Sequence, residues 1–152
     1  MPITVTDRVY REEELPAFAR GLPRDTITLG WEDRSHGHGR RRTDAGVEFA
    51  TSLPRGTVLC SGDRFVLEEP AVVVTVVERP EAVFVVEPRS GPEWALFSYH
   101  IGNRHQPLMI TERTLVCPDV AGMEQLLNQH HIPYVRSMMP FTPVAGLASH
   151  HH

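Results

Sequence analysis

Two neighbouring runs of apolar, β-branched residues limit the possible folds of this chain more than any other feature. Residues 71–79 read AVVVTVVER and residues 81–87 read EAVFVVE, with Pro80 between them. Residues of this kind predict buried strands, and proline cannot donate a hydrogen bond within a strand. We therefore expect the first strand to complete one structural module and the second strand to open another.

The second module has the pattern of a ferredoxin-like domain. Hydrophobic spacing and turn residues predict, in order, a strand at 82–87, a helix at 91–102, strands at 107–111 and 113–117, a helix at 119–130 and a strand at 133–139. This βαββαβ order is ferredoxin-like, and the helices should cover one face of an antiparallel sheet. We expect the second helix to have Asp119 as its N-cap and an apolar face made by Val120, Met123, Leu126 and Leu127.

The first module reads as a small all-β domain. Short strands are predicted at Ile3–Tyr10, Thr26–Glu32, Gly46–Leu53, Thr57–Cys60 and Arg64–Glu68, with turn-forming residues between them. The predicted fold class is therefore α+β, a small all-β domain followed by a ferredoxin-like domain. We expect the domains to be residues 1–74 and 75–142, followed by a flexible, histidine-containing tail at 143–152.

Composition excludes several classes of function. The formal net charge of −4 argues against general nucleic-acid binding. No apolar run approaches the ~18 residues of a membrane-spanning helix, and the N-terminal residues lack a signal-peptide pattern. Cys60 and Cys117 are the two cysteines and do not form a CxxC motif. We therefore expect a cytoplasmic protein without a membrane or nucleic-acid partner.

The nine histidines are clustered, which indicates metal binding. His105 follows a predicted helix that ends at Gly102 and precedes Pro107, which can open a strand. We expect Gly102 to cap the helix with a positive φ, and Trp94, Leu96, Phe97 and Ile101 to form the apolar face of the helix. His105 would then lie on a tight turn between two packed elements, where an imidazole suits a metal ligand.

One imidazole cannot hold a metal ion by itself. A two-fold axis near the turn would bring together His105 from each chain of a homodimer, and the tail residues His150, His151 and His152 could supply further ligands. The tail is either native or part of an expression tag. His100 either packs against the helices or supports the metal site from behind, and Arg104 faces either the partner chain or a client protein.

Other candidate ligands favour structural roles. We interpret the stretch containing His36, Gly37 and His38, together with the arginines at 40–42, as a solvated hairpin loop. His130 and His131 fall near a helix end and are expected to face the helix dipole or solvent. Cys117, on a strand, is expected to be a small buried hydrophobic residue.

The segment Tyr99–Leu108 (YHIGNRHQPL) resembles the hallmark segment of the UreE family, the urease accessory nickel metallochaperones. Pro54–Leu59 with Gly62 and Asp63, and Leu29–Glu32 with the arginine-rich run after it, are similar to the N-terminal domain of that family. Some relatives carry extra histidines where this chain has Asp119, Val120 and Ala121.

The resemblance implies a homodimer that carries Ni(II) and delivers it to apo-urease through the urease accessory GTPase and its partner complex. It implies a β domain for protein contacts, a ferredoxin-like domain for metal and dimerisation, and no enzymatic activity. From the residues alone, the metal is a borderline divalent ion, so Zn(II) or Cu(II) could occupy the same site. Three alternatives stay open: a peptide-binding chaperone module, a general zinc, copper or nickel buffer without a urease role, and a metal-dependent hydrolase.

Overall fold

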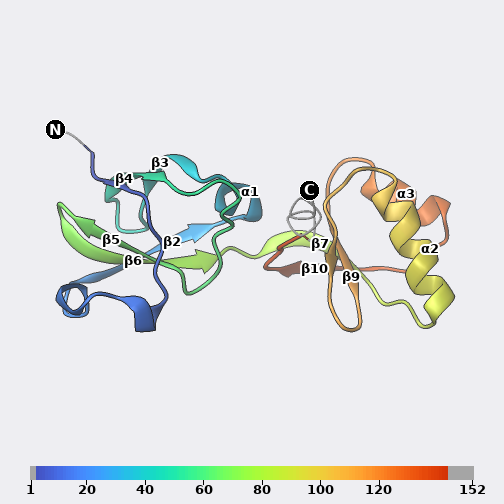
Figure 1. The fold of residues 1–152 in the computed structure, drawn as a ribbon. Coiled ribbons are helices and arrows are strands. Elements are labelled where there is room, and N and C mark those ends of the chain that lie inside the picture. Colours follow the sequence, from blue (N-terminus) through green and yellow to red (C-terminus); the bar gives the residue numbers. More distant parts are fainter. Residues whose placement is uncertain (1–2, 144–152) are drawn as a thin grey trace. The chain divides into compact units, whose positions relative to one another are not determined.

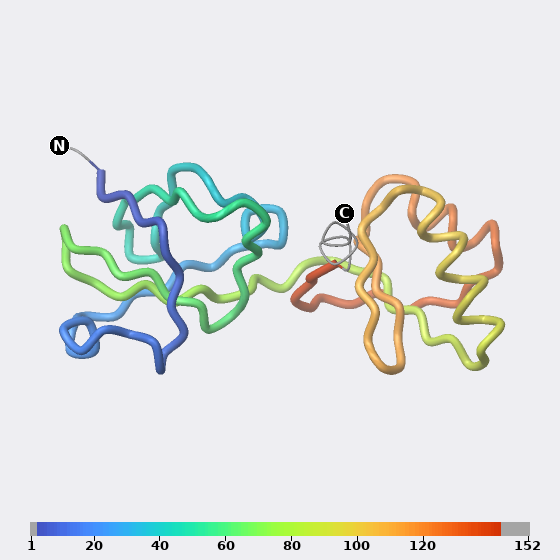
Figure 2. The backbone as a smooth tube through the Cα atoms, viewed as in Figure 1, coloured from blue at the N-terminus to red at the C-terminus, as the bar shows by residue number. Residues whose placement is uncertain are grey.

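A computed structural model describes residues 3–143. The chain forms two compact units that divide between Arg79 and Pro80 (Figures 1 and 2). The division falls later than the predicted boundary at 74–75 because strand β6 (Ala71–Glu78) stays paired with strands of the first unit along its whole length. The predicted α+β class, β-rich first and ferredoxin-like second, is confirmed.

The N-terminal unit contains two three-stranded sheets. Its elements are β1 (Val5–Thr6), the 3₁₀ helices η1 (Glu12–Glu14) and η2 (Ala17–Ala19), β2 (Arg24–Leu29), α1 (Trp31–Arg34), β3 (His38–Arg42), β4 (Glu48–Ser52), β5 (Arg64–Glu68) and β6. One sheet has the order β1-β4-β3 and the other has the order β2-β6-β5. The fully buried rings of Phe49 and Phe65, one from each sheet, lie 5.4 Å apart within a shared apolar core.

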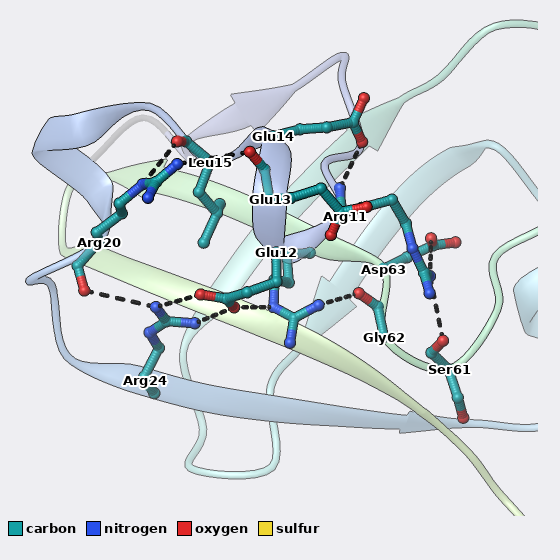
Figure 3. A network of polar contacts seen from close by, with 11 residues as sticks. Arg11, Glu12, Glu13, Glu14, Leu15, Arg20, Arg24, Ser61, Gly62 and Asp63 are labelled. Carbon is teal, nitrogen blue, oxygen red and sulfur yellow. Dashed lines mark hydrogen bonds and ion pairs between the residues drawn. The ribbon is translucent and has the colours of Figure 1, made fainter.

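The two 3₁₀ helices cover a smaller core, in which Leu15 and Ala19 pack with Val73 of β6. Figure 3 shows the ion pairs and hydrogen bonds that hold this segment. Glu12 pairs with Arg24 at 3.0 Å and with Arg64 at 2.7 Å. These exposed or half-exposed pairs position η1 and η2 but each contributes only about 0–1 kcal/mol to stability.

Four segments of this unit differ from the predictions. Of the strand expected at Ile3–Tyr10, only Val5–Thr6 forms a strand, β1. The residues Thr57–Cys60 are not a strand, because the backbone N–H of Leu59 donates to the carbonyl of Arg34 in α1 instead of to a neighbouring strand. The short helix α1 was not predicted. The arginine-rich stretch is also not a loop throughout: His38–Arg42 is strand β3, paired antiparallel with β4.

Arg34 at the end of α1 is completely buried. Its Nε donates to the carbonyl of Leu29 and its Nη1 to the carbonyl of Leu59, both at 3.3 Å, and Nη1 lies 3.9 Å from Oε1 of Glu78. One side chain therefore connects β2, the segment before β5, and the end of β6. A planar guanidinium suits this role because it presents several donors in fixed directions.

The C-terminal unit has the expected ferredoxin-like topology. Its elements are β7 (Glu81–Val86), α2 (Gly91–Gly102), β8 (Met109–Ile110), β9 (Leu115–Pro118), α3 (Met123–Gln129) and β10 (Val135–Met139). The antiparallel sheet has the order β10-β7-β9-β8, and both helices lie on the same side of it (Figure 1). No helix within residues 3–143 is long and apolar enough to cross a membrane.

The apolar faces of the two helices are narrower than predicted. In α2, Phe97 and Ile101 are buried and Trp94 packs against the core, whereas Leu96 is 52% exposed. Positions 94, 97 and 101 follow helical spacing and face the sheet, and position 96 does not. Ser90 caps α2, because its hydroxyl accepts a hydrogen bond from the N–H of Glu93.

Helix α3 begins at Met123, later than predicted. Its N-cap residue is Gly122, with a φ of 89°. Asp119, the predicted N-cap, instead pairs with Arg136 of β10 at 2.9 Å, and Val120 is exposed. Met123, Leu126 and Leu127 are buried as expected.

Replacing Arg34 with methionine should lower the free energy of unfolding of the N-terminal unit by about 3 kcal/mol. The carbonyl of Leu59 loses the guanidinium donor, the carbonyl of Leu29 keeps only the N–H of Arg79, and Glu78 loses its cation. Urea unfolding can be followed by the fluorescence of Trp31 in a Trp94→Phe background, which leaves a single tryptophan. Arg55→Met, at an exposed position, is the control and should change stability by less than about 0.5 kcal/mol. Equal stability of the two variants would contradict the role of Arg34.

Candidate metal centre

The turn after α2 is built from consecutive short-range hydrogen bonds. The N–H of Asn103 donates to the carbonyl of Tyr99 at 3.0 Å, that of Arg104 to Ile101 at 3.2 Å, and that of His105 to Gly102 at 3.0 Å. The helix therefore tightens over its last turn before the chain reverses toward β8. The side chain of His105 is exposed.

His105 adopts a left-handed backbone conformation, with a φ of 56°. Gly102 was predicted to take this conformation, but it is the last residue of α2 and does not have a positive φ. A positive φ costs a residue with a Cβ roughly 1–2 kcal/mol. Backbone strain of this kind is concentrated at functional sites, so the conformation of His105 favours a function for its imidazole.

Arg104 extends from the same turn toward α3. A Cβ atom placed on Gly122 would lie 3.3 Å from Nη2 of Arg104. The guanidinium therefore packs against the N-cap residue of α3, within its own subunit. This contact connects the His105 turn to the second helix.

His100 and His130 form a stacked pair between the two helices. Their ring centroids lie 3.7 Å apart with an interplanar angle of 13°. The rings of Tyr99 and His100 are steeply inclined to each other, with centroids 5.5 Å apart, and Tyr99 is 62% exposed. His130, which sequence reasoning assigned to the helix dipole or solvent, thus packs on another histidine.

Burial lowers the pKa of His130 below its ordinary value, and the nearby imidazoles of His100 and His131 lower it further by repulsion. The neutral form of His130 is therefore favoured in the folded protein. His131, the next residue, also has a positive φ of 55°. The stacked rings of His100 and His130, and the left-handed backbone conformations of His105 and His131, therefore all occur near the ends of α2 and α3.

The two cysteines differ in exposure. Cys117 on β9 is completely buried, as predicted, and burial followed by the charge of Asp119 raises the pKa of its thiol to about 12. A thiol with so high a pKa does not supply the thiolate that binds metal ions. Cys60, in the N-terminal unit, is exposed.

Within residues 3–143, no three or more histidine, cysteine, aspartate or glutamate side chains gather closely enough to hold a metal ion. His105 is exposed and belongs to no such cluster within these residues. The predicted ligands His150, His151 and His152 lie outside the described residues. His36 and His38 are in the N-terminal unit, where Nδ1 of His38 lies 3.3 Å from Oγ of Ser52.

The sequence signals for the site were of unequal strength. The GNRHQPL turn pointed to His105 because glycine and proline bracket it. The stack of His100 on His130 was missed, because it depends on how two helices pack. The signal that could have suggested it is a histidine near the predicted end of both helices.

Comparison with known proteins agrees with both halves of the fold. Residues 6–78 match the family described as "UreE urease accessory protein, N-terminal domain", and residues 81–152 match "UreE urease accessory protein, C-terminal domain". The fold and these two ranges define a two-domain accessory protein of urease maturation. The chain belongs to the UreE family.

Individual relatives extend over most of the chain. The urease accessory protein UreE of Nostoc punctiforme is 30% identical over 84% of this chain and 86% of the relative. The UreE of Citrobacter koseri is 33% identical over 84% of this chain and 87% of the relative. The UreE of Paraburkholderia xenovorans is 32% identical over 86% of this chain, which corresponds to 57% of that longer protein.

The lowered pKa of His130 predicts how stability depends on pH. Folding favours the neutral form of His130, so the unfolded state takes up a proton more readily. The stability that depends on neutral His130 is therefore fully present above the unfolded-state pKa of about 6.5. It is lost as pH falls through the lower pKa of the folded state. Between about pH 7.5 and about pH 5, His130→Gln should therefore lose less unfolding free energy than the unsubstituted protein. Urea unfolding at both pH values measures this, with the exposed His36→Gln as control; parallel losses in all three proteins would contradict the assignment.

Proposed function

We propose that this protein is a nickel metallochaperone that binds Ni(II) between two subunits through His105 of each. The observation that carries the proposal is the exposed imidazole of His105 on a left-handed turn. Membership of the UreE family supports it, because relatives are named urease accessory proteins. The metal ion is the cargo of the protein and not a resident cofactor.

The chemistry of the turn suits a carrier. Two imidazoles from a symmetric dimer would bind the ion at about 2.1 Å each, and tail histidines or water would complete the coordination. A site with two protein donors on exposed turns is open to exchange, whereas a structural metal site is closed by four fixed ligands. Zn(II) and Cu(II) also bind imidazole, so the same donors would accept them.

The cargo would pass to apo-urease through the urease accessory GTPase and its partner complex, in the cytoplasm. The C-terminal unit would provide dimerisation and metal binding, and the N-terminal unit would provide protein contacts. The protein would act by binding and transfer, without catalysing a reaction.

A metal buffer without a urease role is distinguished from a chaperone by adding the GTPase to the nickel-loaded protein. A chaperone transfers Ni(II) to the GTPase faster than release of free Ni(II) allows, and a buffer does not.

Replacing His105 with asparagine should abolish high-affinity nickel binding while preserving the fold. Asparagine removes the imidazole but tolerates a positive φ, so the turn keeps its conformation. Isothermal titration calorimetry should give one Ni(II) per dimer for the unsubstituted protein and at least about a hundredfold weaker binding for the variant, since each dimer loses two ligands.

Two matched variants separate ligation from strain. His105→Gly also permits the left-handed turn and should lose nickel equally. His105→Ala should lose nickel and also about 1 kcal/mol of stability, because alanine disfavours a positive φ. His36→Asn, in the N-terminal unit, should bind nickel normally. Unchanged affinity in His105→Asn would refute the proposed site.

Removing the last three residues tests the contribution of the tail. If His150, His151 and His152 complete the coordination, a chain ending at Ser149 should still bind one Ni(II) per dimer. Its affinity for Ni(II) should be roughly tenfold lower or worse, because the tail imidazoles are missing. The absorption spectrum of bound Ni(II) should change as water replaces imidazole. Identical spectra and affinities for the full and shortened chains would exclude the tail from the site.

A further inference from the structure

Strand β3 (His38–Arg42) is the free edge of its sheet. The sheet order is β1-β4-β3, so β3 has a strand on one side alone. Within residues 3–143, no other strand pairs with its outer edge. Unpaired backbone groups at such an edge are a template for another strand.

The pairing register identifies the groups that face outward. The N–H of Thr43 donates to Val47 at 2.8 Å and the N–H of Leu53 donates to Gly37 at 3.0 Å. In an antiparallel pair, hydrogen-bonded and non-hydrogen-bonded positions alternate. The odd-numbered residues of β3 therefore bond to β4, whereas the N–H and C=O groups of His38, Arg40 and Arg42 point away from it.

The same three residues have exposed side chains on the outer face of the sheet. His38, Arg40 and Arg42 are exposed, whereas Arg41 on the opposite face is half-buried. Strand β4 shows the same alternation. Glu48 and Ser52, opposite Arg42 and His38, are exposed, whereas Phe49 and Thr51, opposite Arg41 and Gly39, are buried. The edge therefore presents backbone donors and acceptors together with the cationic side chains of Arg40 and Arg42.

Arg40 and Arg42 form no ion pair within the part of the chain that the structure describes. Other arginines are paired: Arg11 with Asp63 at 2.8 Å and Arg136 with Asp119 at 2.9 Å, for example. Glu48 lies opposite Arg42 in register, yet the two are not within ion-pair distance. The two guanidinium groups are therefore free to meet carboxylates from another molecule.

Arg41 holds this edge in place from the inner side. Its Nε donates to the hydroxyl of Thr51 at 3.0 Å, its Nη1 donates to the carbonyl of Asp33 at 3.1 Å, and its Nη2 donates to the carbonyl of His36. Burial lowers the pKa of this guanidinium. The strand is thus anchored by one arginine while its two neighbours stay available, which gives a pre-formed docking edge.

We propose that the outer edge of β3 binds an extended acidic segment of a partner protein as an additional strand. Backbone hydrogen bonds to His38, Arg40 and Arg42 would provide affinity. Carboxylates at alternate positions, about 6.8 Å apart, would lie beside Arg40 and Arg42. The same positive charges disfavour pairing with β3 of a second copy.

Charge and composition favour a peptide over a nucleic acid. Single-stranded nucleic acids usually stack their bases on aromatic side chains, and β3 contains none. The net charge of −4 also weakens general attraction of polyanions. This surface belongs to the N-terminal unit and does not involve His105, so it stands independently of the proposed nickel site.

Fluorescence anisotropy with labelled synthetic peptides tests the proposal on the full-length protein at low ionic strength. The probe alternates glutamate with valine over six residues, and the matched probe alternates lysine with valine. The unsubstituted protein should bind the acidic probe and not the basic one. The double variant Arg40→Glu/Arg42→Glu should bind the acidic probe about tenfold more weakly or worse and gain binding of the basic probe.

Two further variants separate the edge from simple charge. Arg55→Glu/Arg113→Glu makes the same change in net charge at exposed positions elsewhere and should bind the acidic probe normally. Arg40→Pro removes an outward N–H that β4 does not use, which an edge strand tolerates, and should abolish binding while circular dichroism and nickel affinity stay unchanged.

Three outcomes would overturn the proposal. Equal loss of binding in the Arg55/Arg113 control would show non-specific attraction. Normal binding by Arg40→Pro would exclude strand addition. Tighter binding of a single-stranded oligonucleotide than of the acidic probe, lost in Arg40→Glu/Arg42→Glu, would assign the edge to nucleic acid.

Discussion

The turn that carries His105 is anchored at both ends by buried side chains. Ile101, in the last turn of α2, is completely buried, and Leu108, just before β8, is 9% exposed. Both pack into the core between the helices and the sheet, and burying each contributes roughly 1.5–3 kcal/mol. The few residues between them must reverse the chain direction, so the left-handed conformation of His105 is maintained by packing that surrounds it.

The two units use different physical means to present functional groups. In the C-terminal unit, helix packing presents one imidazole at a strained turn and stacks two others, His100 on His130. In the N-terminal unit, the buried guanidinium of Arg34 connects separate segments of backbone, while Arg41 anchors an edge strand. If the first unit contacts a partner protein while the second carries the ion, substitutions in one unit can change partner binding without changing metal binding in the other.

Features set by residues close together in the sequence could be predicted, and features set by contacts between separate elements could not. The strand runs on either side of Pro80 and the βαββαβ order were predicted correctly, because hydrophobic spacing within one element reports its burial. The exposure of Leu96 and the start of α3 at Met123 were not, because element boundaries and faces depend on neighbouring elements. The arginine-rich stretch was interpreted as a loop because Gly37 and Gly39 favour turns and because loops are typically polar and exposed. The alternation of its exposed and half-buried side chains nevertheless fits a strand.

The sequence by itself determined the two-module α+β organisation and singled out His105, since both follow from local patterns: runs of β-branched residues, helical spacing, and a glycine and a proline around one histidine. The tertiary structure alone decided that His105 and not Gly102 takes the positive φ, that His100 stacks on His130, and that β3 has an unpaired cationic edge. Each of these depends on residues brought together from separate elements, and no local pattern encodes such contacts.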